Sequence, residues 1–188
     1  MNILYYSATG SPAQEIIESH RIDSRYRWLV WTPTLCRPLP PGLGWFFLRH
    51  CLWQVLRLLP HRKYHVLVIY DGDILAHRSF ITLGWSRFPF MGRNDVQVVS
   101  SWTYEKYRRQ GLATFALSRI LAAYQRPDQG VWYVVHAKNA ASIRVAEKCG
   151  FSLVAKGRRV KRFSLPFRSS FKIDEWIPGT MQRMDRRS

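Results

Sequence analysis

Two stretches decide the fold of this chain: YRRQGLATFALSRILAAYQ at 107–125 and NAASIRVAEKCGF at 139–151. In the first, a short basic turn leads to Gly111, after which apolar residues recur at helical spacing, namely Leu112, Phe115, Ala116, Ile120 and Ala123. In the second, Asn139 is a typical helix N-cap and Gly150 a typical helix stop. Each stretch therefore predicts a helix that begins at a defined turn.

The turn before the first helix has the features of a phosphate-binding site. A helix leaves its first backbone N–H groups without intrahelical partners, and its dipole places positive charge at the same end. Gly111 has no Cβ, so an anion can approach the backbone closely. The sequence contains neither GxxxxGK[ST] nor GxGxxG, which excludes a Walker loop and a dinucleotide-binding fingerprint.

β-prone runs surround these two helices. DVQVVSSWT at 95–103 precedes the first helix, and VWYVVHA at 131–137 separates the first helix from the second. Earlier in the chain, YRWLVWT at 26–32 predicts a strand, and an Asp-Gly pair between β-type runs within 66–83 predicts a hairpin. The order is therefore strand, glycine turn, helix, strand, Asn-capped helix.

This order and these residues resemble the GCN5-related N-acetyltransferase (GNAT) family. RRQGLA at 108–113 is similar to the family's [QR]xxGx[GA] acetyl-CoA motif. The stretch 139–151 is similar to its second motif, NxxSxxxxxxxGF. The resemblance covers about 95–155, and residues 33–65 are not readily matched to it.

The resemblance implies an α/β (α+β) fold. We expect a mixed, mostly antiparallel twisted sheet, flanked by helices, in which the central strands at 95–103 and 131–137 splay apart at one end. We expect a single domain over 1–188. Its cofactor-binding core is predicted at about 95–155, with the acceptor site shaped by about 33–65 and 156–188, the parts that vary within the family.

The resemblance also implies acetyl-CoA as co-substrate, with direct transfer of its acetyl group to an amine. The pantetheine arm is then expected along the first splayed strand, the pyrophosphate on the glycine turn, and the Asn-capped helix on the far side. The implied cofactor-binding residues are Trp102, Thr103, Tyr104, Arg108, Arg109, Gln110, Gly111, Leu112, Ala113, Thr114, Asn139 and Ser142.

The sequence departs from the family pattern at two positions linked to proton transfer. Ala146 stands where many relatives have a tyrosine that protonates the coenzyme A thiolate, and Val134 where some have a glutamate. His136 shares a strand face with Val134 and is the predicted general base, because histidine exchanges protons near neutral pH; a structural role at the strand end is the alternative. Glu105 and Asp95 are weaker base candidates, and pairing with a neighbouring arginine is the alternative for Glu105.

The charge balance is unusual for a globular chain. Lys and Arg number 29 against 12 Asp and Glu, so the formal net charge is +17. The densest stretch is KGRRVKRF at 156–163, and the longer range 156–172 holds seven basic residues and no acidic one. Such an excess favours an anionic ligand, although a solvated basic strand pair is the alternative for this stretch. We therefore expect the acceptor, or the surface that carries it, to be anionic.

Three functions are compatible with these features. The first is N-acetylation of a small amine, such as an amino sugar on a nucleotide or lipid carrier. The second is acetylation of aminoacyl-tRNA or of a protein amine, although nucleic acid is not the favoured partner. The third is a non-catalytic module that binds coenzyme A.

The three cysteines are far apart and form no CxxC pair, so no metal is expected. The sequence does not decide the oligomeric state, and both a monomer and a homodimer are compatible with it.

The stretch GWFFLRHCLWQVLRLL at 44–59 predicts a helix with a narrow polar stripe. A core helix is the favoured interpretation, and an interfacial helix on a membrane is the alternative. No apolar run approaches the ~18 residues of a spanning helix, and MNILYYSATG lacks the pattern of a secretory signal. We therefore expect a cytoplasmic protein, with contact to the inner membrane face through 44–59 as the alternative.

Overall fold

The computed structural model describes residues 2–8, 20–34, 36–44, 65–84, 88, 90–161 and 169–178. Almost all of the helix predicted at 44–59 lies outside the described residues. Parts of the two segments expected to shape the acceptor site, 33–65 and 156–188, lie outside them as well.

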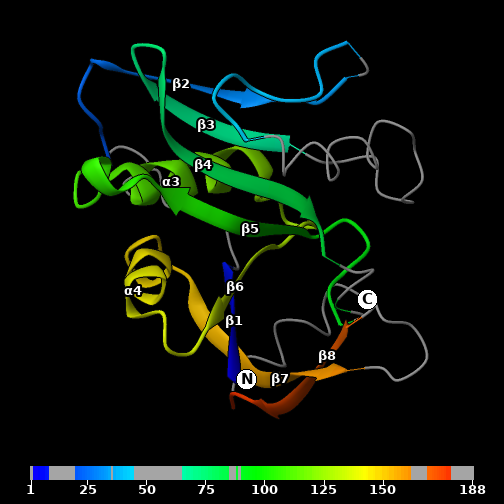
Figure 1. Ribbon diagram of the computed structural model, residues 1–188. Helices are drawn as coiled ribbons and strands as arrows, with labels where there is room; N and C mark the ends of the chain where they lie inside the picture. The colour runs from blue at the N-terminus through cyan, green and yellow to red at the C-terminus, as the bar shows by residue number, and fades with distance from the viewer. Residues whose placement is uncertain are drawn as a thin grey trace.

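The described residues form one eight-stranded sheet in the order β2-β3-β4-β5-β6-β1-β7-β8. Its strands are β1 (Asn2–Ala8), β2 (Tyr26–Trp31), β3 (His65–Asp71), β4 (Ile74–Leu83), β5 (Val96–Thr103), β6 (Val131–His136), β7 (Ser152–Lys161) and β8 (Ser169–Trp176). The helices are η2 (Glu105–Tyr107), α3 (Leu112–Tyr124) and α4 (Ala140–Lys148). Figure 1 shows α3 beside the β2–β5 half of the sheet and α4 beside the other half.

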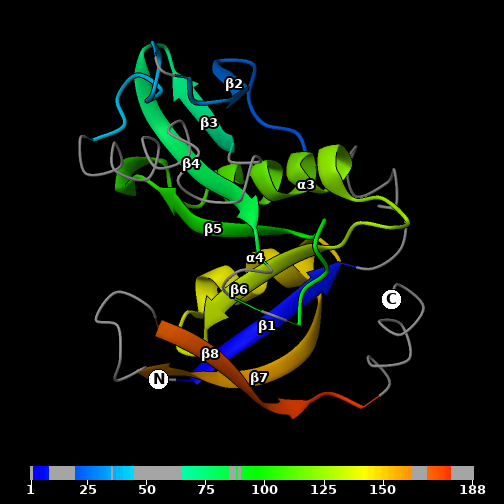
Figure 2. The ribbon, with the colours of Figure 1, turned by 90° about the vertical axis from the view of Figure 1, so that its right-hand side faces the viewer.

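β5 and β6 are the parallel neighbours in a sheet whose other pairs are antiparallel. They pair over three positions, from Val96↔Val131 to Val98↔Tyr133. Both strands continue beyond the last pair, so they diverge toward their carboxyl ends. The mostly antiparallel sheet with splayed central strands is therefore confirmed, and Figure 2 shows its two halves one above the other.

A β-bulge lies in β5 next to the point where it leaves β6. Arg78 pairs with Trp102, whereas Phe80 pairs with Val99, so β5 carries one extra residue in this interval. Ser100 lies within the bulge and has a left-handed backbone (φ +49°). The Arg78 guanidinium donates to the Ser100 carbonyl at 3.0 Å. Because a bulge bends and twists a strand, this one helps to turn β5 away from β6.

Asp95 joins the two splayed strands at their closed end. Its buried carboxylate accepts hydrogen bonds from Gly92 N at 3.0 Å, Gly130 N at 2.7 Å and Trp132 Nε1 at 2.7 Å. The Val96 amide also donates to the Gly130 carbonyl at 3.0 Å. These contacts tie the residues that precede β5 to those that precede β6, so the sheet opens at one end only.

The N-terminal strand lies in the middle of the second half-sheet. β1 pairs antiparallel with β6 on one side and with β7 on the other. Its side chains alternate: Leu4 and Tyr6 pack in the cluster that includes α3, whereas Ile3 and Tyr5 pack on the opposite face. Only the strand itself, and not its neighbours, follows from the local sequence pattern.

The predicted apolar face of α3 is correct except at its end. Leu112, Phe115, Ala116 and Ile120 are buried, as expected, and so are Leu117, Ser118 and Leu121. Ala123 is exposed, contrary to the prediction. The middle of the helix is buried on most sides, whereas in the last turn Tyr124 packs against the core and Ala123 is on the exposed side.

Candidate functional site

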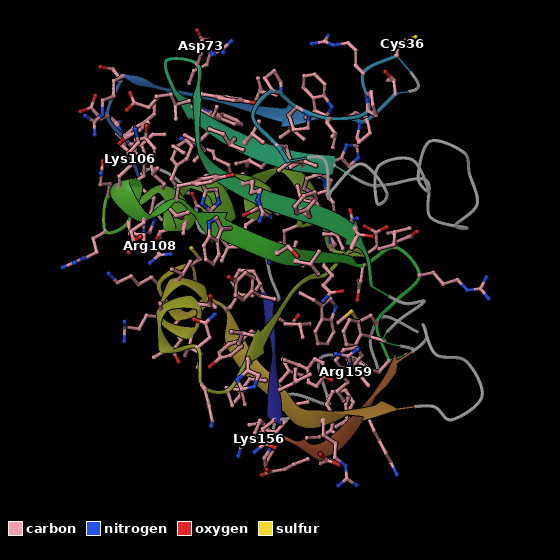
Figure 3. All side chains as sticks on the ribbon, in the orientation of Figure 1. Cys36, Asp73, Lys106, Arg108, Lys156 and Arg159 are labelled. Carbon is pink, nitrogen blue, oxygen red and sulfur yellow. The ribbon has the colours of Figure 1, made fainter. Side chains whose placement is uncertain are left out.

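A groove of about 640 Å³ lies at the open end of the sheet, beyond the last β5–β6 pair. Its walls are the end of β5, the turn before α3, the first turn of α3, one side of α4, and β6. Figure 3 shows Arg108 on the side of the molecule where the ends of α3 and α4 come together. The lining residues are Ser101, Trp102, Thr103, Tyr107, Arg108, Arg109, Gly111, Leu112, Ala113, Thr114, Tyr133, Asn139, Ala141, Ser142, Val145 and Lys148.

The turn before α3 has the geometry of an anion site. Arg109 and Gly111 both have left-handed backbones, with φ of +63° and +78°. Gly111 is the N-cap of α3, and the first turn of that helix contains no acidic residue. A Cβ placed on Gly111 would meet nothing within 4 Å, so the space in front of this backbone is open. The free N–H groups and the helix dipole can therefore receive a phosphate group there.

Arg108 is held at the mouth of the groove by three contacts. Its Nε donates to the Thr103 carbonyl at 3.4 Å, and its guanidinium lies 5.2 Å from the centre of the Trp102 ring. Its Nη1 lies 3.8 Å from Glu105 Oε1. Glu105 is exposed on η2 and pairs with Arg108, which is the alternative that the sequence left open for it; it does not line the groove.

The second motif forms the opposite wall. Asn139 caps α4, with its side-chain oxygen accepting from Ser142 N at 3.1 Å. The cap uses the amide oxygen, and the NH₂ group of Asn139 is a donor that can serve a ligand. Ala146, at the position where many relatives have tyrosine, is fully buried.

Ten of the twelve predicted cofactor-binding residues line this groove, and Tyr104 and Gln110 lie elsewhere. The Gln110 side-chain oxygen accepts from Arg25 Nη2 at 2.8 Å and from the Tyr26 hydroxyl. Gln110 thus fastens the turn to the segment around β2. Tyr104 lines a separate pocket beside the β3–β4 hairpin.

His136 lies at the end of β6. Strand alternation places it on the face of Val134, opposite to Tyr133 and the helices. Its Nδ1 accepts from the Lys138 amide at 3.1 Å. In the neutral ring, Nε2 then carries the proton and is a donor. His136 does not line the groove, and its role as general base stays a prediction.

The family model of the acetyltransferase (GNAT) domain matches residues 13–152. The chain belongs to the GNAT family. Similar solved structures include a tandem GNAT protein from the clavulanic acid biosynthesis pathway, with a TM-score of 0.51, 12% identity, and 81% of this chain and 50% of that one covered. A functionally unknown conserved protein from Staphylococcus epidermidis ATCC 12228 has a TM-score of 0.51, 10% identity, and coverages of 82% and 58%. A GCN5-related N-acetyltransferase-like protein from Streptococcus suis 89/1591 has a TM-score of 0.49 and 12% identity, with 91% of this chain and 61% of that one covered.

At these identities the first two structures support the fold of this GNAT domain. The chain spans half to about three fifths of the length of these three solved structures. No curated protein matches its sequence.

A row of buried and half-buried polar side chains lies behind the groove of the GNAT domain, and of its members only Thr103 is among the predicted site residues. His77 on β4 is fully buried, with Nδ1 2.7 Å from Thr103 Oγ1 and Nε2 2.9 Å from Ser79 Oγ. The Ser79 hydroxyl donates to Ser101 Oγ at 2.9 Å. The sequence carries one signal of this row. His77 and Ser79, and likewise Ser101 and Thr103, are two residues apart in β-prone runs, and this spacing places each pair on one face of its strand.

Tyr133 ends this row. It is buried, it lines the groove, and it belongs to the last residue pair between β5 and β6. Burial raises the pKa of Tyr133, and hydrogen bonds with the side chains of Ser142 and Ser101 partly offset this effect.

Cys149 is buried behind the groove, at the end of α4. Its Sγ lies 3.5 Å from the Thr114 carbonyl, and burial raises the pKa of the thiol to about 12. Within the described ranges, no group of three His, Cys, Asp or Glu residues is placed to hold a metal ion. Among the helices that can be described, none is long and apolar enough to cross a membrane.

The burial of His77 predicts loss of stability in acid. Burial, with a smaller contribution from Arg78, lowers the pKa of His77 to about 3. Between about pH 3 and 6.5 the unfolded chain therefore binds the extra proton, so stability falls as the pH is lowered. From pH 7 to pH 5 we expect a loss of about 2 kcal/mol from this group. Urea unfolding at both pH values should show a smaller loss for H77N, and equal losses would contradict the prediction.

Proposed function

We propose that this GNAT domain is an acetyl-CoA-dependent N-acetyltransferase. The observation that carries the proposal is the groove, in which an open, positively polarised helix start lies beside two diverging strands. In this proposal the backbone around Arg109 and Gly111 holds the pyrophosphate, and the edge of β5 at Trp102 holds the pantetheine arm. Asn139 lines the opposite side. When bound, acetyl-CoA supplies the acetyl group as a thioester.

The resemblance to the family also suggests how the rest of the chain is divided. We take 1–188 as a single domain in which 95–155 binds the cofactor, and 33–65 and 156–188 shape the acceptor site. Transfer needs a donor hydrogen bond on the thioester oxygen, which the backbone of the β5 bulge can supply because its extra residue is outside the ladder. His136 and Glu105 stay predictions for the removal of the amine proton.

For the acceptor we propose a primary amine on an anionic carrier, such as an amino sugar on a nucleotide or lipid phosphate. The net charge of +17 supports this class. Part of the positive charge is neutralised locally: Lys156 lies 3.1 Å from Glu175, and Arg158 lies 3.3 Å from Asp174. In Figure 3 the Lys156 side chain lies beside β7 and β8, well away from Arg108. Lys156 and Arg158 of β7 therefore add less to the positive charge available for an acceptor than a count of basic residues suggests.

Matched acceptors test the proposal. We expect acetyl-CoA to bind, and thiol release to be faster with glucosamine 6-phosphate than with glucosamine. The kcat/KM ratio should be at least ~10, equivalent to ~1.4 kcal/mol, and should shrink as salt is raised, because salt screens exposed charges. Equal rates would contradict the anionic acceptor.

Other outcomes separate the alternatives. Turnover with aminoacyl-tRNA or a lysine peptide, but not with small amines, would favour the macromolecular acceptor. Binding of acetyl-CoA without turnover on any amine would favour the non-catalytic module, an alternative to which the missing tyrosine at Ala146 points. Failure to bind acetyl-CoA would overturn the proposal as a whole.

A further inference from the structure

Tyr133 lies where the groove meets the buried polar row. The row begins at Thr103, passes through His77, Ser79 and Ser101, and ends at Tyr133. Its two ends, Thr103 and Tyr133, both line the groove. The row is therefore a hydrogen-bonded connection through the protein interior between two points of the groove wall.

Such a row is unfavourable unless it is fully hydrogen-bonded. His77 and Ser79 are buried between strands, where polar atoms without partners lose the hydrogen bonds that they make in water. Apolar side chains would fill the same strand face without this requirement. The arrangement therefore calls for a role beyond packing, and its termini in the groove indicate where that role lies.

We propose that Tyr133 donates the proton that the sulfur of coenzyme A needs as it leaves, and that the buried row orients and reprotonates Tyr133. This inference rests on the proposed function. The amine nitrogen forms a bond to the acetyl carbon, the C–S bond breaks, and its electron pair stays on sulfur. The hydroxyl proton of Tyr133 passes to that sulfur, and Ser101 returns a proton to Tyr133. Ser101 is reprotonated by Ser79, Ser79 by His77 Nε2 and His77 Nδ1 by Thr103, which takes up a proton from solvent in the groove. The amine releases one proton to solvent.

The hydrogen-bond directions agree with this role. A neutral imidazole has one N–H group, and burial keeps His77 neutral. Because Ser79 uses its only proton toward Ser101, its oxygen accepts from His77 Nε2, and His77 Nδ1 then accepts from Thr103. Hydrogen bonds with the side chains of Ser142 and Ser101 both lower the pKa of Tyr133, which is the effect of groups that donate to its hydroxyl oxygen. The proton of Tyr133 is thereby left to be donated elsewhere.

The other candidate acids of the groove fit less well. Ala146 replaces the tyrosine of many relatives and is buried. Burial raises the pKa of the Cys149 thiol to about 12, and Cys149 does not line the groove. Lys148 lines the groove, but it is exposed at the end of α4. Tyr107 is also a buried tyrosine on the groove wall, but Tyr133 combines this position with hydrogen bonds to Ser142 and Ser101.

Y133F tests the first half of the proposal, with Y124F as the matched control, because Tyr124 is a half-buried tyrosine of α3 outside the groove. We expect Y133F to lower kcat ~10- to 100-fold with little change in the KM for acetyl-CoA. Calorimetry gives a readout that needs no turnover. Wild type and Y124F should bind coenzyme A ~2- to 10-fold more tightly than desulfo-coenzyme A, and Y133F should lose this preference. An unchanged kcat or a retained preference in Y133F would overturn the role of Tyr133.

S101A and S101T test the row, and they keep the proposal testable should Y133F not fold. S101A should lower kcat several-fold at unchanged coenzyme A affinity, whereas S101T keeps the hydroxyl and should stay within about twofold of wild type. Equal kcat in S101A and wild type would overturn the role of the row. Failure of the proposed function would look different, because the wild type itself would then release no thiol with any amine.

Discussion

Replacing Gly111 with aspartate is expected to weaken the binding of coenzyme A ~100-fold or more. The new carboxylate would stand in the open space in front of the α3 N-terminus, where we place the pyrophosphate. Two unit charges 4 Å apart interact by about 4 kcal/mol near a protein surface, and ~2.7 kcal/mol is already a factor of 100. Calorimetric titration with coenzyme A measures the effect directly.

Two variants separate charge from backbone strain. Gly111 has φ +78°, so any side chain there is strained, and G111N carries that strain without the charge. Gly72, at the β3–β4 hairpin, has φ +57°, and a Cβ added there would meet nothing within 4 Å, so G72D places the same side chain on a similar backbone outside the groove. We expect G111N to lose much less affinity than G111D, and G72D to bind as wild type. Equal affinity of G111D and G72D would contradict the phosphate site.

Features that depend on a few consecutive residues could be predicted from the sequence. Asn139 caps a helix through a bond to Ser142, three residues away. Gly111 adopts the left-handed backbone that a glycine at a helix start permits. The Asp71–Gly72 turn joins β3 and β4 as expected. In each case the interaction that decides the conformation is local, so its residues are visible together in the sequence.

Features that depend on distant residues could not be predicted in the same way. β1 pairs with β6 and β7, whose residues lie more than 120 positions later. Its hydrophobic pattern fits many sheet positions equally well. Likewise, nothing local connects His77 to Thr103, or Lys156 to Glu175, because strand register alone brings each pair together. The hydrogen bonds that join the polar row behind the groove therefore depend on the fold and cannot be read from the local sequence.

Replacing Asp95 with alanine is expected to destabilise the fold by about 3 to 5 kcal/mol. The buried carboxylate serves three donors. Its removal leaves two buried donors, the Gly130 amide and the Trp132 indole N–H, without their partner, and also frees the more exposed Gly92 amide. Each buried donor left without a partner costs about 1–3 kcal/mol. Urea unfolding measures the change. D128A is the control, because Asp128 is an exposed carboxylate of the turn before β6, and we expect it to change stability by less than ~0.5 kcal/mol.

A double-mutant cycle with W132F assigns part of this loss to the indole. Trp132 donates to Asp95 at 2.7 Å, and phenylalanine removes that donor while keeping an aromatic ring. In the W132F background D95A should therefore cost ~1–2 kcal/mol less than in wild type. Strictly additive effects would mean that the indole bond contributes nothing, and the two amides would then hold the closed end alone.

D95A should also weaken the binding of coenzyme A at the open end of the sheet. Because β5 and β6 pair over only three positions, loosening the closed end changes the spacing of both strands, and the same calorimetric titration detects the effect.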